Sequence, residues 1–238
     1  MSLETVDLHR LPLNTGQRVL DLGCGEGRHA ITAYLHADVQ VIGLDLSRGD
    51  IDIARGRFSD FEDPNAAGKS LDFIVGSGLT LPFADASFDR VICSEVLEHI
   101  HNYQAVLREI QRVLKPGGLL ALSVPRFAPE WICWKLSDAY HEVEGGHVRI
   151  FRRKQLKDAA EHVDMVHYAT HGAHALHVPY WWLRCLFWGN ENAAPVRLYH
   201  RLLVWDLMSR PRLTRWLDRL LNPWFGKSIV MYFVRGLT

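Results

Sequence analysis

Short apolar runs alternate with amphipathic segments along the N-terminal half of the chain. The runs RVLDLG, VQVIGLDLS, LDFIVG, SFDRVICSE and LLALSVP each fit a buried strand bounded by turn residues. The segments between them predict helices over residues 28–35, 50–61 and the stretch after Asn102, with Ser47 and Asn102 as N-caps. The residues KPGG are expected to end the third helix. This alternation is typical of a parallel sheet covered by helices on both faces.

The C-terminal half departs from this alternation. Helices are predicted over residues 130–139 and 153–162, and strands at DMVHYATHGAH and at the final SIVMYFVRG. Between these two strands, residues 175–227 hold six of the eight tryptophans of the chain. Three helical stretches fit this segment, with breaks around GNENAAP and SRPR. The sequence therefore predicts a helical, tryptophan-rich insertion before the last strand.

Composition and charge narrow the class of protein. A chain of 238 residues with 48% hydrophobic residues is sufficient for one α/β domain that carries an insertion. The formal net charge of zero disfavours nucleic acid as the main partner. The four cysteines lack CxxC spacing, which favours a reducing compartment, and neither a signal peptide nor a spanning apolar stretch is found. We therefore expect a cytoplasmic protein.

A glycine-rich loop follows the first predicted strand. Gly23, Gly25 and Gly27 lie between this strand and a helix, where missing Cβ atoms let a ligand approach the backbone and the free N–H groups of the helix. A dinucleotide site needs G-x-G-x-x-G, but Arg28 occupies the third glycine position, so a nicotinamide oxidoreductase is the weaker alternative. Asp45 ends the second strand, where a carboxylate can accept hydrogen bonds from both ribose hydroxyls. The loop therefore predicts a nucleotide-type cofactor.

Two further motifs, GSGLTLPFADASFDRVICSEVLEHI and LREIQRVLKPGGLLALSVP, follow the loop in order. Together with it they resemble the class I S-adenosylmethionine (SAM)-dependent methyltransferases, of the methyltransferase-11 type, over residues 15–125 and more weakly to residue 162. The resemblance implies one Rossmann-like α/β domain over residues 1–238, with seven strands in the order 3-2-1-4-5-7-6. It also implies SAM as the cofactor and methyl transfer to oxygen of a small or lipid-like acceptor. The alternative is a SAM-binding regulatory or interaction protein without turnover.

The resemblance also assigns roles to individual residues. Asp45 would hold the ribose, with Leu46 against the adenine, and Ser94 and Glu95 would face the methionine amino group or the acceptor. Family members commonly carry an aspartate where this chain has Ser77, which puts the strength of adenine binding in doubt. The methionine side would be lined by Asp21, Gly23, Cys24, Gly25 and Gly27, and the adenine edge by Ser77, Gly78 and Leu79.

Histidines are the candidate catalytic bases, because their ordinary pKa lies near neutrality. His147, in EGGHVRIF, is similar in position to an acceptor-side histidine of the ubiquinone-pathway O-methyltransferases, and His99, His141 and Glu95 are alternatives. The run of His171, His174 and His177 has no helical context that would cluster it, and no standard zinc spacing occurs in the chain. We therefore predict no metal site.

The insertion over residues 175–227 leaves three interpretations open. In the usual plan of the family the last two strands form a close hairpin, whereas here they are separated by a segment rich in tryptophan and arginine. The insertion would be a lid over an apolar acceptor pocket, a homodimer surface, or a surface that contacts an anionic membrane. SEVLEH stands where base-modifying enzymes usually have Asn/Asp-Pro-Pro-aromatic, so the expected acceptor is a small, hydrophobic molecule and not nucleic acid.

Overall fold

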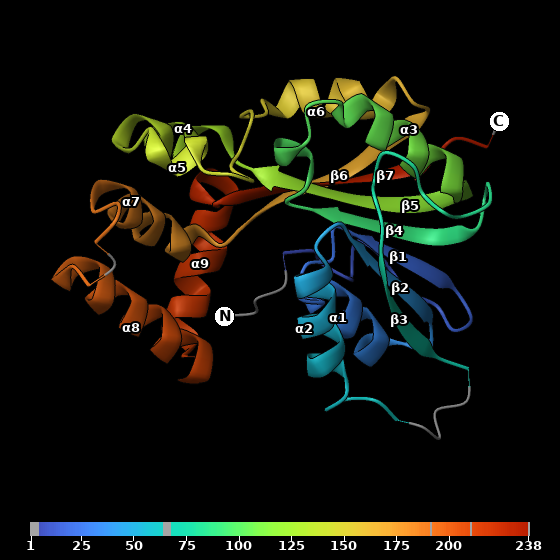
Figure 1. Cartoon of the computed structure of the whole chain (residues 1–238), viewed down its shortest axis with the longest axis horizontal. Helices are drawn as coiled ribbons and strands as arrows, with labels where there is room; N and C mark the ends of the chain where they lie inside the picture. Colours follow the sequence, from blue (N-terminus) through green and yellow to red (C-terminus); the bar gives the residue numbers. More distant parts are fainter. Residues whose placement is uncertain (1–4, 64–67, 191, 210, 238) are drawn as a thin grey trace.

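Seven strands form one sheet at the centre of the computed structural model, which describes residues 5–63, 68–190, 192–209 and 211–237 (Figure 1). The strand order is β3-β2-β1-β4-β5-β7-β6, as the family resemblance implied. Only β7 runs antiparallel to its neighbours β5 and β6, and the other pairings are parallel. The strands are β1 (Arg18–Leu22), β2 (Gln40–Asp45), β3 (Ser70–Val75), β4 (Phe88–Ser94), β5 (Leu114–Pro125), β6 (Met165–Ala173) and β7 (Ser228–Arg235).

Strand β5 begins earlier than the sequence predicted. The residues KPGG end the preceding helix as expected, but they continue directly into the strand, which starts at Leu114 opposite Phe88. A register shift between Phe88 and Arg90 accommodates this segment, and Gly117 adopts a left-handed φ of 73° within it. Residues 115–118 are therefore an unpaired bulge between two positions of β5, Leu114 and Leu119, that pair with β4.

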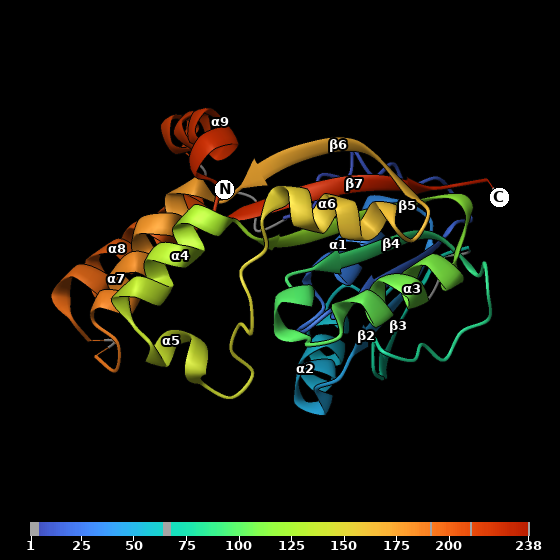
Figure 2. The ribbon, with the colours of Figure 1, turned by 90° about the horizontal axis from the view of Figure 1, so that it is seen from above.

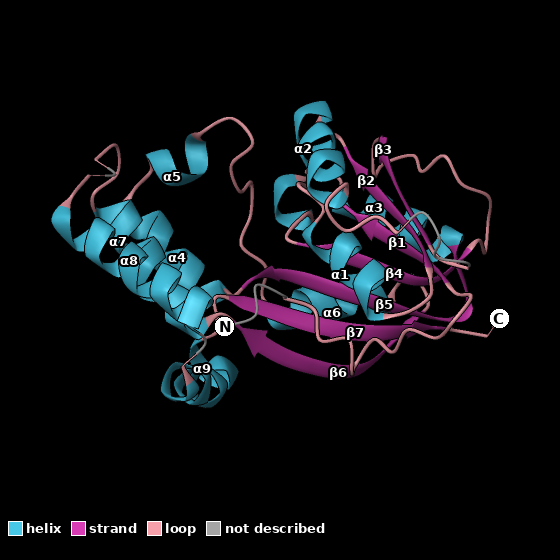
Figure 3. Ribbon diagram, turned by 90° about the horizontal axis from the view of Figure 1, so that it is seen from below, coloured by secondary structure: helices cyan, strands magenta, loops and turns pink. Residues whose placement is uncertain are grey.

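Helices cover both faces of the sheet. α1 (Arg28–His36) and α2 (Arg48–Phe58) pack on one face, and α3 (Tyr103–Val113) and α6 (Arg153–Glu161) pack on the other, each over its own apolar cluster (Figure 2). The predicted N-caps are confirmed, because Ser47 Oγ accepts from Asp50 N at 3.2 Å and Asn102 Oδ1 accepts from Ala105 N at 3.3 Å. Figure 3 shows the same layers from the opposite side.

The other helices form a separate lobe beyond the carboxyl end of β6 (Figures 2 and 3). α4 (Phe127–Leu136) and α5 (Ala139–Glu142) replace the single helix that the sequence predicted over residues 130–139. The three predicted helices of the insertion are confirmed as α7 (Val178–Leu186), α8 (Ala194–Ser209) and α9 (Arg212–Phe225). The breaks between them include residues 191 and 210, and the predicted loop DPNAAGKS includes residues 64–67, all of which lie outside the described residues.

Polar contacts attach the lobe to the sheet. Asn222 Oδ1 accepts from Ala175 N at 2.8 Å, and Asp218 Oδ1 accepts from Leu176 N at 3.2 Å, which ties α9 to the turn after β6. Trp182 Nε1 donates to Pro129 O at 3.1 Å and so joins α7 to α4. Within the described ranges, no helix has both the length and the apolar character needed to cross a bilayer.

Candidate cofactor and acceptor site

The glycine loop is held at the carboxyl ends of β1 and β2. Gly23 N donates to Leu44 O at 2.7 Å, which fixes the start of the loop to β2. Asp45 Oδ2 accepts from Gly25 N at 2.8 Å, and its Oδ1 accepts from Ser47 N at 2.8 Å. Each carboxylate oxygen has a second acceptor position, so Asp45 can bind two further hydroxyl groups while it organises the loop. This arrangement fits the predicted ribose contact.

The three glycines of the loop serve different needs. All three have left-handed φ angles, of 70° at Gly23, 50° at Gly25 and 86° at Gly27. A Cβ at Gly23 would overlap Val96 Cγ2, and one at Gly27 would lie 2.9 Å from Phe73 Cζ. A Cβ at Gly25 would meet no heavy atom within 4 Å. Two glycines are therefore required by the packing of the protein itself, and only Gly25 leaves space that a ligand can use.

Gly25→Ala and Gly27→Ala are expected to separate these two needs. At Gly25, the new Cβ would enter the open space and weaken binding of SAM, the cofactor that the resemblance implies. The left-handed backbone there would cost only roughly 1–2 kcal/mol of stability. At Gly27, the same backbone cost adds to an overlap with Phe73 and Ala54, so the melting temperature should fall further. Calorimetric SAM titration and thermal unfolding measure both effects, and equal losses of affinity and stability in the two variants would contradict this division.

Asp21 lies below the loop as a buried acid. It is 1% exposed, and its Oδ2 has no hydrogen-bond partner in the described structure. Burial raises its pKa from 3.8 to about 7, against the opposing effects of a hydrogen bond from Ala30 N and the charge of Arg28. An unpartnered carboxyl oxygen in this place fits a ligand that supplies an N–H donor or a positive charge, such as the methionine amino group.

Asp21→Asn is expected to be more stable than the wild type at pH 8, by at least about 1 kcal/mol. The folded-state pKa of Asp21 lies above its ordinary value, so its ionisation opposes folding. This loss of stability is absent near pH 4, grows as the pH rises towards about 7, and is then constant. Urea unfolding at pH 4, 6 and 8 tests this. A difference in unfolding free energy that does not change with pH would mean that the pKa of Asp21 is not raised.

Apolar side chains flank Asp45 on the predicted adenine side. Leu46 is 76% exposed and Leu79 is 45% exposed, which is unusual for large aliphatic residues and fits the two faces of a flat base. Ser77 Oγ accepts from Leu79 N at 3.2 Å, so the hydroxyl that replaces the usual aspartate shapes the turn. A Cβ at Gly78 would lie 3.4 Å from Leu22 Cδ1. Burial raises the pKa of the Cys24 thiol, which therefore lines the loop as a neutral group.

A chain of polar contacts crosses the ends of β4 and β5. Ser123 Oγ donates to Glu95 Oε1 at 2.9 Å and lies 2.8 Å from Ser94 Oγ, which is 3.2 Å from His29 Nε2. Glu95 Oε2 lies 3.7 Å from Lys227 Nζ. Glu95 also has a left-handed φ of 59°, a strained backbone that is typical of functional positions. Ser94 and Glu95 thus belong to one polar group with His29, Ser123 and Lys227, three residues that the sequence analysis missed. The role of Ser94 and Glu95 towards the methionine amino group or the acceptor stays a prediction.

His147 lies in a second polar group, between the end of the sheet and the helical lobe. Its Nδ1 is 2.5 Å from Glu130 Oε1, and Glu130 also accepts from Trp134 Nε1 at 3.1 Å and from Tyr140 OH at 3.2 Å. Burial alone would raise the pKa of Glu130, but the hydrogen bond and charge of His147 and the charge of Lys227 lower it. Glu130 is therefore an ionised partner that orients the His147 ring, and no sequence signal indicated it.

His99 packs beside His147, with the ring centroids 4.8 Å apart. The pKa of His99 is lowered by burial and by the neighbouring His147. Two predicted catalytic histidines are thus brought together by the structure, close to the end of β4 that carries Glu95. The remaining candidate, His141, stacks on Trp134 with a centroid distance of 4.1 Å, which is a packing role.

The run of His171, His174 and His177 has local partners. The His171 ring stacks on Tyr232 at 5.6 Å, and its Nε2 is 3.2 Å from Thr5 O. His174 Nε2 lies 3.1 Å from Thr5 Oγ1, and its ring packs edge-on against His177 at 5.4 Å. Burial lowers the pKa of all three rings. These contacts attach the N-terminal segment to the end of β6.

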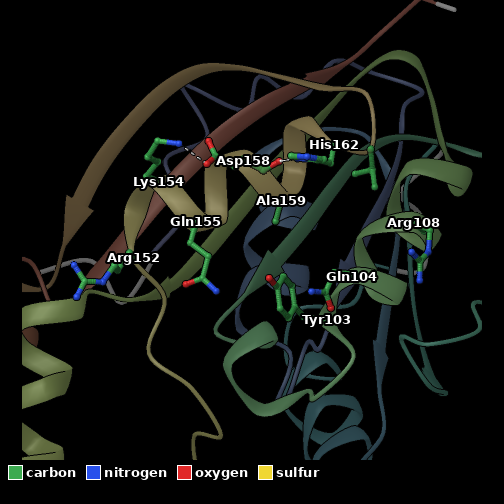
Figure 4. Close-up of a pocket in the computed structure, with 10 residues that line it drawn as sticks. Tyr103, Gln104, Arg108, Arg152, Lys154, Gln155, Asp158, Ala159 and His162 are labelled. Atoms are coloured by element: carbon green, nitrogen blue, oxygen red, sulfur yellow. Dashed lines mark hydrogen bonds and ion pairs between the residues drawn. The ribbon is translucent and has the colours of Figure 1, made fainter.

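A hollow of about 710 Å³ lies on the outer surface, between α3 and α6. Figure 4 shows Tyr103, Gln104 and Gln155 around it, with Lys154 and Asp158 joined by a 2.7 Å hydrogen bond. None of its lining residues belongs to the glycine loop, to Asp45 or to the His147 group. The hollow is therefore separate from the candidate cofactor site.

Part of the chain is similar in sequence to known methyltransferases. Residues 20–122 match the family model described as a methyltransferase domain. The O-methyltransferase rstn1 of Aspergillus nomiae is 39% identical over 114 residues, which cover 48% of this chain and 49% of that protein. A sterol 24-C-methyltransferase of Eremothecium gossypii is 31% identical over 150 residues, which cover 63% of this chain and 37% of that protein. The chain thus spans about half, or less, of the length of these relatives.

A solved structure shares the fold over most of the chain. Phosphoethanolamine N-methyltransferase 2 of Haemonchus contortus, in complex with SAM, superposes with a TM-score of 0.62 at 20% identity. The superposition covers 96% of this chain and 51% of that chain. At this level of identity, the similarity concerns the arrangement of the sheet and its helices.

Proposed function

Residues 20–122 match a methyltransferase-domain model, and on this premise we propose that the chain is a class I SAM-dependent methyltransferase that methylates an oxygen atom of a small, apolar organic acceptor. The proposal rests on one observation: two groups occur at the same end of the sheet, the glycine loop with Asp45 and the Glu130–His147 pair. The first group would hold the cofactor, and the second would act on the acceptor.

The residues at the loop fit SAM chemically. Asp45 can accept from the ribose hydroxyls, Leu46 and Leu79 offer exposed apolar surface for the adenine, and the open space at Gly25 admits the ligand. The unpartnered oxygen of Asp21 can accept from the methionine amino group. When bound, SAM supplies an activated methyl group, so that the protein mainly aligns the acceptor and excludes water, which can lower a barrier by roughly 7–11 kcal/mol.

His147 is the group placed to take the acceptor proton. Its Nδ1–H is directed at Glu130, which leaves Nε2 as the basic nitrogen of the neutral ring. With bound SAM supplying the methyl group, His147 would accept the proton of the acceptor hydroxyl on Nε2. Ionised Glu130 stabilises the imidazolium that results, so the two residues act as an oriented base.

Aromatic side chains of the lobe support an apolar acceptor and the lid interpretation of the insertion. The Tyr140 ring lies 5.8 Å from His147, 5.8 Å from Trp188 and 6.2 Å from Trp181. Lys227 Nζ lies 5.2 Å from the centre of the Trp181 ring. α7 thus supplies aromatic surface beside the proposed base, where a hydrophobic ring or chain of the acceptor would lie.

An assay of S-adenosylhomocysteine release tests the proposed function. Purified protein is incubated with SAM and with panels of phenols, quinols and hydroxylated lipids, and with small polar alcohols for comparison. We expect release with apolar hydroxyl compounds and a methyl ether as the product. SAM binding without release from any acceptor would favour the alternative of a regulatory SAM-binding protein. Methylation at carbon, as the name of the sterol relative describes, would overturn oxygen as the acceptor atom.

The outer side of α9 fits the surface of an anionic membrane, which we propose as a peripheral partner. Exposed apolar residues recur along one side of this helix, and exposed arginines run beside them, as in helices that lie in a membrane interface. The buried free cysteines fit a reducing compartment, so the proposed location is the cytoplasmic face of that membrane. The apolar residues are Leu213, Trp216, Leu220 and Trp224, and the arginines are Arg212, Arg215 and Arg219.

Trp216→Glu is expected to reduce binding to vesicles that contain phosphatidylglycerol by at least about tenfold, because it places a negative charge in the apolar side of α9. Binding should also weaken with salt and be absent for vesicles of neutral lipid alone. The matched control is Trp131→Glu, since Trp131 is an exposed tryptophan on α4. Co-sedimentation measures binding. Equal binding of both variants and the wild type to the vesicles would overturn the membrane proposal. So would a dimer that depends on Trp216 and does not bind vesicles.

A further inference from the structure

Three side chains, one of which is the proposed base His147, have the composition of a metal site. Glu98 and His99 lie in the single turn η1 (Leu97–His99), and His147 lies in the loop after α5. One carboxylate oxygen of Glu98 and one ring nitrogen of each histidine lie within 4.8 Å of one another. Two histidines and one carboxylate are a common ligand set for Zn²⁺ and related divalent transition metals.

In the part of the chain that the structure describes, the carboxyl group of Glu98 is buried without a hydrogen bond that would stabilise a negative charge. Its side chain is 1% exposed, and neither carboxylate oxygen has a hydrogen-bond partner among the described residues. A buried carboxylate without a partner is costly, and most such groups in proteins are paired or bind a metal. The neighbouring acids differ in this respect, because Glu95 accepts from Ser123 and Glu130 accepts from Trp134 and Tyr140. The unpartnered oxygens of Glu98 therefore indicate a cationic ligand.

Both histidines are oriented as metal ligands usually are. His99 Nδ1 lies 2.8 Å from Gly145 O, and His147 Nδ1 lies 2.5 Å from Glu130 Oε1. Carbonyl and carboxylate oxygens only accept hydrogen bonds, so each Nδ1 must carry the hydrogen and each neutral ring keeps its lone pair on Nε2. A carboxylate or carbonyl behind the ring is the usual support of a metal-bound histidine. The exposed edge of His99 provides a path from solvent.

We propose that Glu98, His99 and His147 bind one divalent transition-metal cation, with Zn²⁺ the best fit. Three protein ligands leave at least one coordination position for water or a substrate oxygen. The sequence analysis predicted no metal site, because His147 is far in the chain from the Glu98–His99 pair and the spacing is not that of a standard zinc motif. The proposal therefore differs from the expectation drawn from sequence spacing alone.

The cation would change how the acceptor loses its proton, and this part of the inference rests on the proposed function. A hydroxyl bound at the open position would have a lowered pKa and would release its proton to solvent water. The lone pair of His147 would then hold the cation and would not take the proton. Metal binding itself needs neither SAM nor an acceptor, so it can be tested without any turnover.

Calorimetric titration of the full chain with zinc chloride tests the proposal, after the protein has been stripped with a chelator and dialysed. We expect one equivalent of zinc to bind, and Co²⁺ to give the visible absorption of a bound histidine complex. Glu98→Gln and His99→Ala should each lower zinc affinity by at least tenfold. The control is His101→Ala, which removes an exposed histidine two residues away and should leave zinc affinity unchanged.

The outcomes separate this inference from the proposed function. No zinc binding by the wild type, or equal affinity in the wild type, Glu98→Gln and His99→Ala, would overturn the metal site. Thermal unfolding and SAM titration of the same samples show whether each variant is folded. Because His99 is exposed, His99→Ala should disturb the fold less than Glu98→Gln. Zinc binding in a protein that fails to bind SAM would support the metal site and contradict the proposed function.

Discussion

Asp45→Ala is expected to weaken SAM binding by at least tenfold. In the proposed complex, the carboxylate accepts from ribose hydroxyls, and hydrogen bonds to a charged group contribute roughly 1.5–3 kcal/mol each. The same carboxylate accepts from Gly25 N and Ser47 N, so its removal also releases the glycine loop from the end of β2. Loss of the ligand contact and loss of the loop position act in the same direction, and calorimetric titration with SAM measures their sum.

Two variants separate these contributions. Asp45→Asn keeps one oxygen acceptor but loses the charge, so its affinity should lie between those of the wild type and Asp45→Ala. Asp52→Ala removes an exposed acid of α2 that pairs with Arg55 at 3.4 Å, and it should bind SAM like the wild type. If Asp45→Ala bound SAM as tightly as Asp52→Ala, Asp45 would have no role at the ribose.

The elements that contact the cofactor were predictable because their signals are local. The strand RVLDL, the glycine spacing and the carboxylate at the end of the next strand lie within one β-α-β unit, whose geometry is nearly fixed by its connections. The sheet order implied by the resemblance is confirmed, and residues 20–122 match a methyltransferase-domain model. The structure adds that a Cβ at Gly27 would lie 2.9 Å from Phe73 Cζ of β3, a restriction between distant positions that no local spacing encodes.

The acceptor side was less predictable because its contacts join distant segments. His147 was identified by a short resemblance, but Glu130, which orients it, lies on a different element and has no motif around it. Glu95 meets Ser123 because β4 and β5 are paired neighbours, and Lys227 reaches them because the start of β7 lies beside the end of β5. Such partners follow from the topology of the sheet and not from the sequence around each residue.

In the insertion, too, the elements were predictable from the sequence but the contacts between them were not. Its three helices were predicted from periodicity, but the faces that they turn inward were not. Trp181 and Trp188 of the α7 region approach Tyr140, whereas Trp216 and Trp224 of α9 are exposed. Tryptophans that look equivalent in composition therefore divide between a proposed acceptor wall and a proposed membrane surface.

His147→Ala is expected to lower kcat by roughly 100-fold or more, the usual contribution of a positioned base, while the affinity for SAM changes less than about twofold. The separation follows from the structure, because His147 contacts Glu130, His99 and Tyr140 but none of the residues of the glycine loop. Single-turnover methylation of a phenolic acceptor measures the effect on chemistry, and SAM titration measures binding. An unchanged rate would exclude His147 both as the base and as a ligand of a required metal.

Glu130→Gln tests whether the carboxylate acts through His147. An amide oxygen can still accept from His147 Nδ1, so the ring should stay oriented, but the negative charge that stabilises imidazolium is removed. We expect an intermediate loss of kcat with an unchanged KM for the acceptor. If Glu130 had a purely structural role, Glu130→Gln would instead lower the stability of the protein and raise the KM for the acceptor. The kcat of the folded fraction would then be unchanged. The ratio of kcat to KM effects therefore decides whether the buried carboxylate of α4 belongs to the chemistry or only to the packing of the lobe.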